Sequence, residues 1–137
     1  MKKNIIITLS LLFTIISCKN QESEVIKFPN KDSELAILMR DLTLNVELMK
    51  DQIQEGLSPE ILVKLEELHT AIPTDSNLRS NEVYTELTNS FIESIESLEE
   101  TKEQKIEKYN TMLQTCIQCH KYVCPGPIKK IRKLRIQ

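Results

Sequence analysis

The segment ELAILMRDLTLNVELMKDQIQE, residues 34–55, repeats apolar side chains at steps of three and four residues. Such spacing gives a helix one apolar face along its length. The residues that share this face are Leu35, Leu38, Met39, Leu42, Val46, Met49 and Ile53. Asp32 or Ser33 can cap the start of the helix, and Gly56 can end it. The segment therefore predicts a long helix with one face buried.

Two further apolar stripes follow along the chain. Residues 59–72 begin with Ser58 at the N-cap position and Pro59 at the first helical position, which is a strong signal for a helix start. Residues 81–98 carry a stripe formed by Val83, Leu87, Phe91, Ile95 and Leu98. Both segments are predicted to be amphipathic helices.

A fourth helix is predicted over residues 101–123. Thr101 and Gln104 fit a capping box, so we expect the chain to break near residue 100. Aromatic residues make up only 4% of the 137 residues, and tryptophan is absent, which favours helices over a sheet. Four helices with short connections in a chain of single-domain length predict an all-α fold, an up-down four-helix bundle over residues 31–124.

Charge is divided unevenly along the chain. From Cys18 to His120 there are 20 acidic and 10 basic residues, whereas residues 121–137 contain six basic residues and no acidic one. Nucleic-acid binding requires a broad positive surface. The acidic body therefore argues against nucleic acid as the main partner.

The first residues resemble an export signal. A short positive start is followed by the apolar run 5–16, which spans roughly 18 Å as a helix and is too short to cross a bilayer core of about 30 Å. Ile15-Ile16-Ser17-Cys18 resembles the lipobox of bacterial lipoproteins. This resemblance implies removal of residues 1–17, lipidation of Cys18 and membrane attachment on the exported, periplasmic or cell-envelope side, with 18–30 as a tether. An ordinary secretory signal is the alternative.

Cys116-Ile117-Gln118-Cys119-His120 is a C-x-x-C-H sequence, the attachment signature of c-type haem. Residues three apart share a helical face, so both cysteine thiols can reach one porphyrin edge. His120 is then placed to bind the iron as the proximal ligand. The sequence predicts one covalent haem c.

Other interpretations of the same residues stay open. A structural zinc site from Cys116, Cys119, His120 and Cys124 would crowd neighbouring ligands. A redox C-x-x-C usually opens a helix in a thioredoxin-like unit, which is not evident here. A disulfide within the cluster suits an oxidising compartment but leaves His120 without a role.

A C-x-x-C-H motif on the last helix of a four-helix bundle resembles cytochrome c′ and its methionine-ligated relatives. In that family the first helix crosses the distal haem face with either an aliphatic residue or a methionine ligand. The resemblance implies that Met39 lies at this position, as a distal ligand to the iron or as a packing residue. Two departures weaken the likeness to the gas-binding members: Cys124 replaces the usual basic residue four positions after the histidine, and the stretch 39–116 is short.

Other methionine, histidine and cysteine residues are weaker candidates for a role at the haem. Met49 is a second, less favoured distal ligand, and Met112 is poorly placed because it shares the helix of the motif. His69 is expected to face solvent. Cys124 is interpreted as an inert buried thiol, with an intermolecular disulfide or a redox-active thiol as alternatives.

In the basic tail, residues 125–137, Ile128, Ile131 and Leu134 recur every three residues. This pattern predicts a short amphipathic helix or turn whose apolar side covers the haem edge and whose cations pair with the haem propionates. Docking on an anionic membrane or on an acidic redox partner is an alternative, as is a solvated extension.

The expected function is electron transfer, since histidine–methionine ligation saturates the iron. The alternatives are a five-coordinate haem that binds a small gas such as nitric oxide or carbon monoxide, and a haem-free lipoprotein. No catalytic constellation is evident, so an enzyme is not expected. The redox partner is not indicated by the sequence, and a homodimer stays open.

Overall fold

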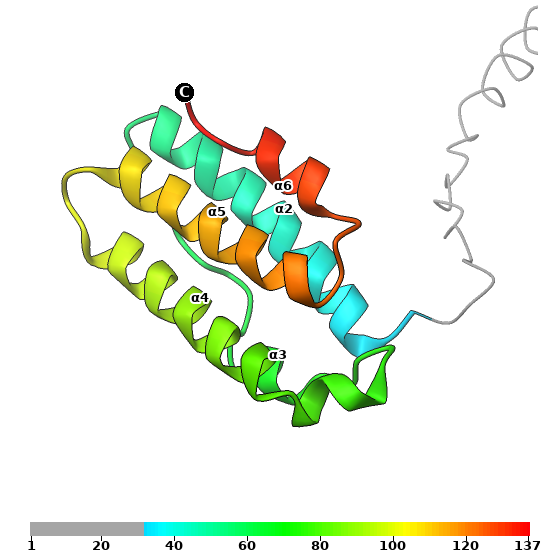
Figure 1. Ribbon diagram of the computed structural model, residues 1–137. Helices are drawn as coiled ribbons and strands as arrows, with labels where there is room; N and C mark the ends of the chain where they lie inside the picture. The colour runs from blue at the N-terminus through cyan, green and yellow to red at the C-terminus, as the bar shows by residue number, and fades with distance from the viewer. Residues whose placement is uncertain (1–31) are drawn as a thin grey trace, which may run out of the picture.

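The computed structural model describes residues 32–137, and the regular structure within this range is entirely helical (Figure 1). The elements are α2 (Glu34–Gln54), α3 (Glu67–Thr70), the 3₁₀ helix η1 (Ser76–Ser80), α4 (Glu82–Glu100), α5 (Lys105–Tyr122) and α6 (Ile128–Lys133). The predicted all-α class is confirmed for these residues. The predicted signal peptide (1–17), the predicted lipid-bearing Cys18 and the predicted tether (18–30) lie outside the described residues.

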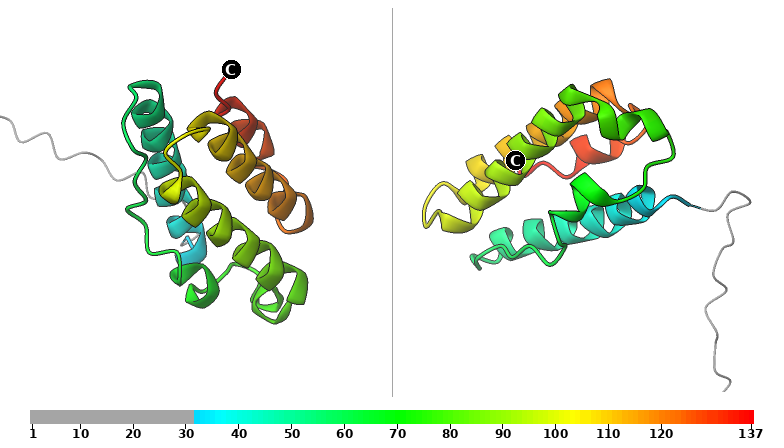
Figure 2. Two further views of the ribbon diagram at one scale, coloured as in Figure 1. Left: turned by 90° about the vertical axis from the view of Figure 1, so that its left-hand side faces the viewer. Right: turned by 90° about the horizontal axis from the view of Figure 1, so that it is seen from below.

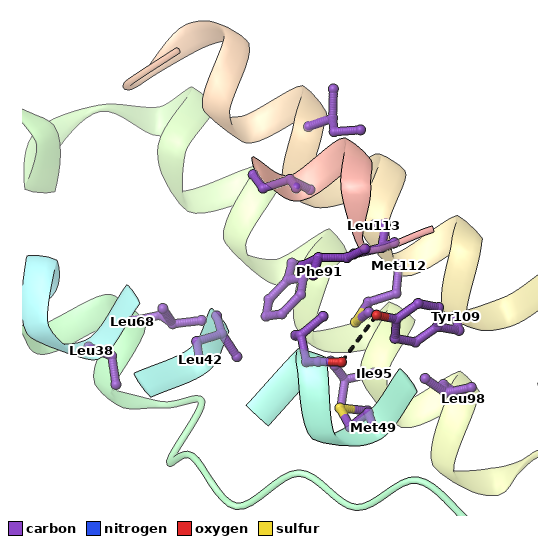
Figure 3. Packing of buried hydrophobic residues seen from close by; sticks show 14 of the residues in the cluster. Leu38, Leu42, Met49, Leu68, Phe91, Ile95, Leu98, Tyr109, Met112 and Leu113 are labelled. Atoms are coloured by element: carbon purple, nitrogen blue, oxygen red, sulfur yellow. Dashed lines mark hydrogen bonds between the residues drawn. The ribbon is translucent and has the colours of Figure 1, made fainter. Parts of the chain in front are cut away.

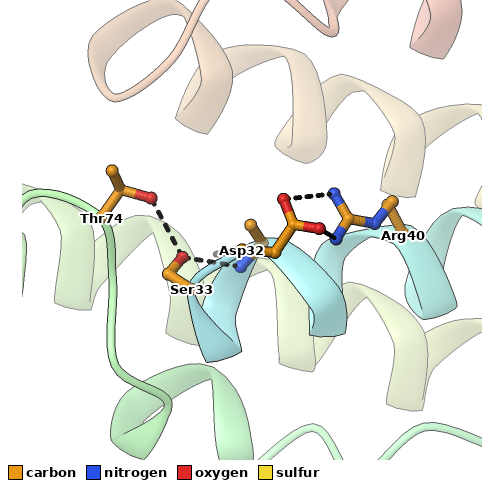
Figure 4. Close-up of polar contacts among 5 residues, drawn as sticks. Asp32, Ser33, Arg40 and Thr74 are labelled. Carbon is orange, nitrogen blue, oxygen red and sulfur yellow. Dashed lines mark hydrogen bonds and ion pairs between the residues drawn. The ribbon is translucent and has the colours of Figure 1, made fainter. Parts of the chain in front are cut away.

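Polar side chains fix the start of α2, as the sequence predicts. The Ser33 hydroxyl oxygen accepts a hydrogen bond from the Ala36 N–H at 3.2 Å and another from the Thr74 hydroxyl at 3.0 Å (Figure 4). Asp32 forms an ion pair with Arg40 at 2.6 Å. These contacts cap the helix and tie its first turn to the loop around residue 74.

The predicted helix over 59–72 is wrong. Residues 57–64 have no regular structure, and only α3 at the end of this stretch is helical. The buried side chain of Asn45 takes over the hydrogen bonding, because its Nδ2 donates to the Glu60 carbonyl at 3.0 Å and its Oδ1 accepts from the Leu62 N–H at 2.6 Å. The backbone groups are therefore satisfied outside a helix.

The described residues arrange three long helices, α2, α4 and α5, together with one non-helical segment, residues 57–64. α4 and α5 run antiparallel to one another, and α2 packs against α5 (Figures 1 and 2). Residues 57–64 return along α2, held there by Asn45 and by Gln52, whose side chain accepts from the Glu60 N–H at 3.1 Å. Within residues 32–137 the structure thus has three long helices and one non-helical segment where four helices were predicted.

The core lies where α2, α4 and α5 meet. Its most deeply buried side chains, all at 0% exposure, are Met49, Ile95, Leu98, Tyr109 and Met112 (Figure 3). The Tyr109 hydroxyl donates to the Val46 carbonyl at 3.1 Å and so joins α5 to α2. The buried face predicted for α4 is correct from Phe91 onward, but Tyr84 and Thr88 line the core where Val83 and Leu87 were expected. An aromatic ring buries more apolar surface than valine, so the face turns toward Tyr84.

The predicted break near residue 100 is confirmed, but the capping box is not formed. The Thr101 hydroxyl donates to the Glu103 carbonyl at 2.7 Å and therefore does not cap a helix. Gln104 has a φ of 59°, in the left-handed region, and α5 begins only after it. The fourth helix thus starts four residues later than predicted and ends at Tyr122, close to its predicted end.

The tail forms a packed helix, as the periodicity predicts. Ile131, Leu134 and Ile136 are buried. The Asn110 side chain on α5 donates to the Ile136 carbonyl at 2.9 Å and accepts from the Ile136 N–H at 3.1 Å. An ion pair at 3.5 Å joins Lys130 to Glu47 of α2. The interpretation of the tail as a solvated extension is therefore wrong.

Candidate functional site

The two cysteines of the motif lie in the last two turns of α5 and share one face of the helix. Met112, Cys116 and Cys119 are separated by steps of four and three residues, so the thiols continue a buried stripe toward the end of the helix. Both cysteines are partly buried and pack against the core. Cys116, Cys119 and Cys124 are free thiols, so the disulfide alternative is not seen among them.

Burial keeps the two helical thiols protonated. It raises the pKa of Cys116 to about 12, with a contribution from the charge of Cys119, and it raises the pKa of Cys119 to about 11, with a contribution from Cys124. The motif also lies at the C-terminal end of α5, where the helix dipole disfavours negative charge. A redox-active C-x-x-C needs a lowered thiol pKa. This environment therefore argues against the redox interpretation.

Two buried tyrosines, Tyr109 and Tyr84, lie near the thiols. Burial raises the pKa of Tyr109, and the charge of Cys116 adds to this effect. Burial also raises the pKa of Tyr84, with a contribution from Cys119, and the Tyr84 hydroxyl donates to the Leu68 carbonyl at 2.6 Å. Both cysteines therefore lie near buried tyrosines of the core, Cys116 near Tyr109 and Cys119 near Tyr84.

The His120 ring is held by the loop that follows α5. Its Nδ1 lies 3.0 Å from the Cys124 carbonyl oxygen and 3.2 Å from the Cys124 Sγ. A carbonyl oxygen can only accept, so we infer that Nδ1 carries the hydrogen and donates it. In the neutral ring the lone pair is then on Nε2. This is the form in which a histidine binds a metal through Nε2, with the other nitrogen anchored by a carbonyl.

Met39 lies in the second turn of α2, is partly buried and packs against the core. The start of α2 and the end of α5 are at the same end of the molecule, so Met39 and the motif lie in the same half of the bundle (Figure 1). Met49 and Met112 are both completely buried in the core (Figure 3). His69 on α3 is exposed, as expected.

Cys124 differs from the prediction of a buried thiol, since it is exposed in the loop between α5 and α6. The reason is local: Pro125, Gly126 and Pro127 end the helix, and the loop turns away from the core. The sequence analysis also missed Tyr84. Its spacing from Thr88 and Phe91, four and three residues, is the signal that would have identified it.

The ligands of the zinc alternative are not brought together. Within residues 32–137, no group of three or more histidine, cysteine, aspartate or glutamate side chains is arranged to hold a metal ion. A tetrahedral zinc site would need such a group. A c-type haem would take only two thiols and one imidazole nitrogen from the chain, and the donors on α5 fit that requirement.

Comparisons with protein-family models, with curated proteins and with solved structures found no match for this chain. Among the helices that the structure describes, none is both long and apolar enough to cross a membrane.

Proposed function

We propose that this protein is a membrane-anchored c-type cytochrome that carries one haem on α5 and transfers electrons on the extracytoplasmic side. One arrangement carries the proposal: two free thiols on a single helical face, next to a histidine whose Nδ1 is anchored and whose Nε2 has no hydrogen-bond partner within residues 32–137. Thioether formation requires thiols that are not paired with each other. Iron ligation requires an unprotonated imidazole nitrogen.

Each residue has a separate role in this proposal. Cys116 and Cys119 would hold the porphyrin covalently, and His120 would bind the iron through Nε2. The Cys124 carbonyl orients the imidazole ring. A bound haem would supply one-electron redox chemistry, while the chain would bind it and orient its ligand.

The likeness to the cytochrome c′ family supports Met39 as the sixth ligand. In the proposed haem protein α5 would hold the haem, and Met39 of α2 would supply the sixth ligand. The start of α2 is held in place by its cap and by the ion pair of Asp32 with Arg40. A fixed helix end favours a defined position for the Met39 side chain.

The attachment to the membrane is proposed from the first residues of the sequence. The apolar run 5–16 and Cys18 are interpreted as an export signal and a lipid-bearing residue. Covalent lipid would hold the helical body at a membrane surface.

The test is the visible spectrum of the full chain produced with the bacterial haem-attachment machinery. The wild-type protein is expected to keep its haem after denaturation and to show a low-spin spectrum. Met39→Leu removes the sulfur but conserves the volume, so the fold should be kept and the haem should become high-spin. Met49→Leu is the matched control and should stay low-spin.

Other outcomes identify the alternatives. A wild-type haem that is high-spin and takes up carbon monoxide would favour the gas-binding function, with Met39 as a packing residue. A folded, exported protein without covalent haem would leave only a haem-free helical lipoprotein.

A further inference from the structure

The strongest feature that the proposed function leaves unexplained is the basic surface of the C-terminal segment. Residues 121–137 contain six basic residues and no acidic one, whereas residues 32–120 contain 18 acidic and 7 basic residues. Positively charged side chains are therefore concentrated in the C-terminal segment, whereas the rest of the described chain is acidic. A solvated tail would not hold such charges in a fixed place, but this tail is folded onto the bundle.

The packing of α6 directs its charges outward. Ile131, Leu134 and Ile136 are buried, and the cationic side chains on the other side of the segment are exposed. We define the basic face of α6 by four exposed cationic residues: Lys129, Arg132 and Lys133 of the helix, and Arg135 just after it. In the described part of the chain these four side chains form no ion pair, while Lys130 pairs with Glu47.

We infer that the basic face of α6 is the docking surface for an acidic electron-transfer protein. The inference rests on the proposed function, since it names the partner of the haem carried by α5. α6 packs on α5 and follows the motif after a loop of only a few residues (Figure 1). A partner bound to the basic face is therefore separated from the helix that would carry the haem by α6 alone.

The chemistry of the surface favours a protein over a lipid bilayer. A helix that docks in a membrane inserts its apolar face into the lipid. The apolar residues of α6 are already used in the core, so only electrostatic attraction remains. Electron-transfer complexes are small and transient, and electrostatic complementarity mainly speeds their association.

The test uses the haem-loaded full chain in its reduced form and hexacyanoferrate(III) as an anionic oxidant. Lys129→Glu with Lys133→Glu reverses two charges on one side of α6. Lys64→Glu with Lys102→Glu, at exposed positions elsewhere, gives the same net charge. At low ionic strength the oxidation rate should fall about tenfold in the α6 variant and less than about twofold in the control. The difference should vanish near 1 M salt, where charges are screened within about 3 Å.

The outcomes separate the two proposals. Equal slowing of both variants would show an effect of net charge alone and overturn the docking surface. An unchanged oxidation rate, with loss of binding to vesicles of anionic phospholipid in the α6 variant, would identify a membrane-facing surface instead. Haem in the wild type without any α6 effect rejects the inference only, whereas a haem-free wild type rejects the proposed function and this inference with it.

Discussion

The cysteines within α5 and the cysteine after it carry the same thiol group in two different environments. Cys116 and Cys119 are partly buried on the core side of the helix, where burial raises the pKa of Cys116 to about 12 and that of Cys119 to about 11. Cys124 is exposed in the following loop and lies 3.2 Å from His120 Nδ1.

This difference shows that the burial of each thiol depends on whether the residue lies on the core side of α5 or in the loop after it, although the three cysteines are close in sequence. The helical pair is partly buried and packs against the core. Cys124 points outward, and its backbone carbonyl contacts the imidazole. In the proposed function the pair would attach the haem, and the backbone carbonyl of the third cysteine would orient the ligand.

The largest expected effect is on the amount of covalent haem, which should depend on Cys116 and Cys119 but not on the Cys124 thiol. Cys116→Ala with Cys119→Ala should abolish covalent haem, because no thioether can form. Cys124→Ala should keep the full amount, because it leaves both attachment thiols and the carbonyl at position 124 in place. The measurement is the haem spectrum of the denatured polypeptide. Loss of haem in the Cys124 variant would show that the distinction between the two environments is wrong.

The second expected effect is a difference in alkylation rate between Cys116 and Cys124 in the haem-free protein. At pH 8, alkylation by iodoacetamide should be at least about tenfold slower at Cys116 than at Cys124, because burial raises the pKa of Cys116 to about 12 and that of the exposed Cys124 by less, and each unit of pKa lowers the thiolate population tenfold. Mass spectrometry of the peptides measures both rates. In urea the three thiols should react at similar rates, which is the control. Fast reaction of Cys116 in the folded protein would contradict its burial.

The smallest expected effect concerns stability against pH. In the unfolded chain Cys116 loses its proton near its ordinary pKa of 9.0, whereas the folded chain keeps the proton until about pH 12. The contribution of this thiol to the free energy of unfolding is therefore complete below pH 9 and is lost as the pH rises toward 12.

Urea unfolding of the haem-free protein between pH 8 and pH 11 measures this loss. Cys116→Ala should weaken the dependence on pH without removing it, because burial also raises the pKa of Cys119, Tyr84 and Tyr109. An unchanged slope in the variant would show that Cys116 titrates alike in the folded and unfolded chains.

The sequence by itself determined the helical class, the ends of α2, the break before α5 and the packed tail. Each follows from a local pattern: apolar spacing, a capping side chain, or prolines that stop a helix. It also determined that Cys116 and Cys119 share a face of α5, because that follows from a spacing of three residues on any helix.

Only the tertiary structure decided the conformation of residues 57–64. Ser58 and Pro59 form a good helix start, yet Asn45, far away in sequence, provides the hydrogen bonds that a helix would have made. Ile61, Val63 and Leu65 are partly buried, and the residues between them are exposed, a period of two that a helix cannot present. The choice depended on a partner from another segment, which no local pattern contains.

The same reason applies to the site. The sequence supplied the donors, but the orientation of His120 comes from the fold of the loop that places the Cys124 carbonyl 3.0 Å from Nδ1. Likewise, which residues of the tail face water was settled by contacts of Ile131, Leu134 and Ile136 with the core. Residue types and their spacing are local properties, whereas the hydrogen-bond partner and the buried side of each group exist only once the segments have packed.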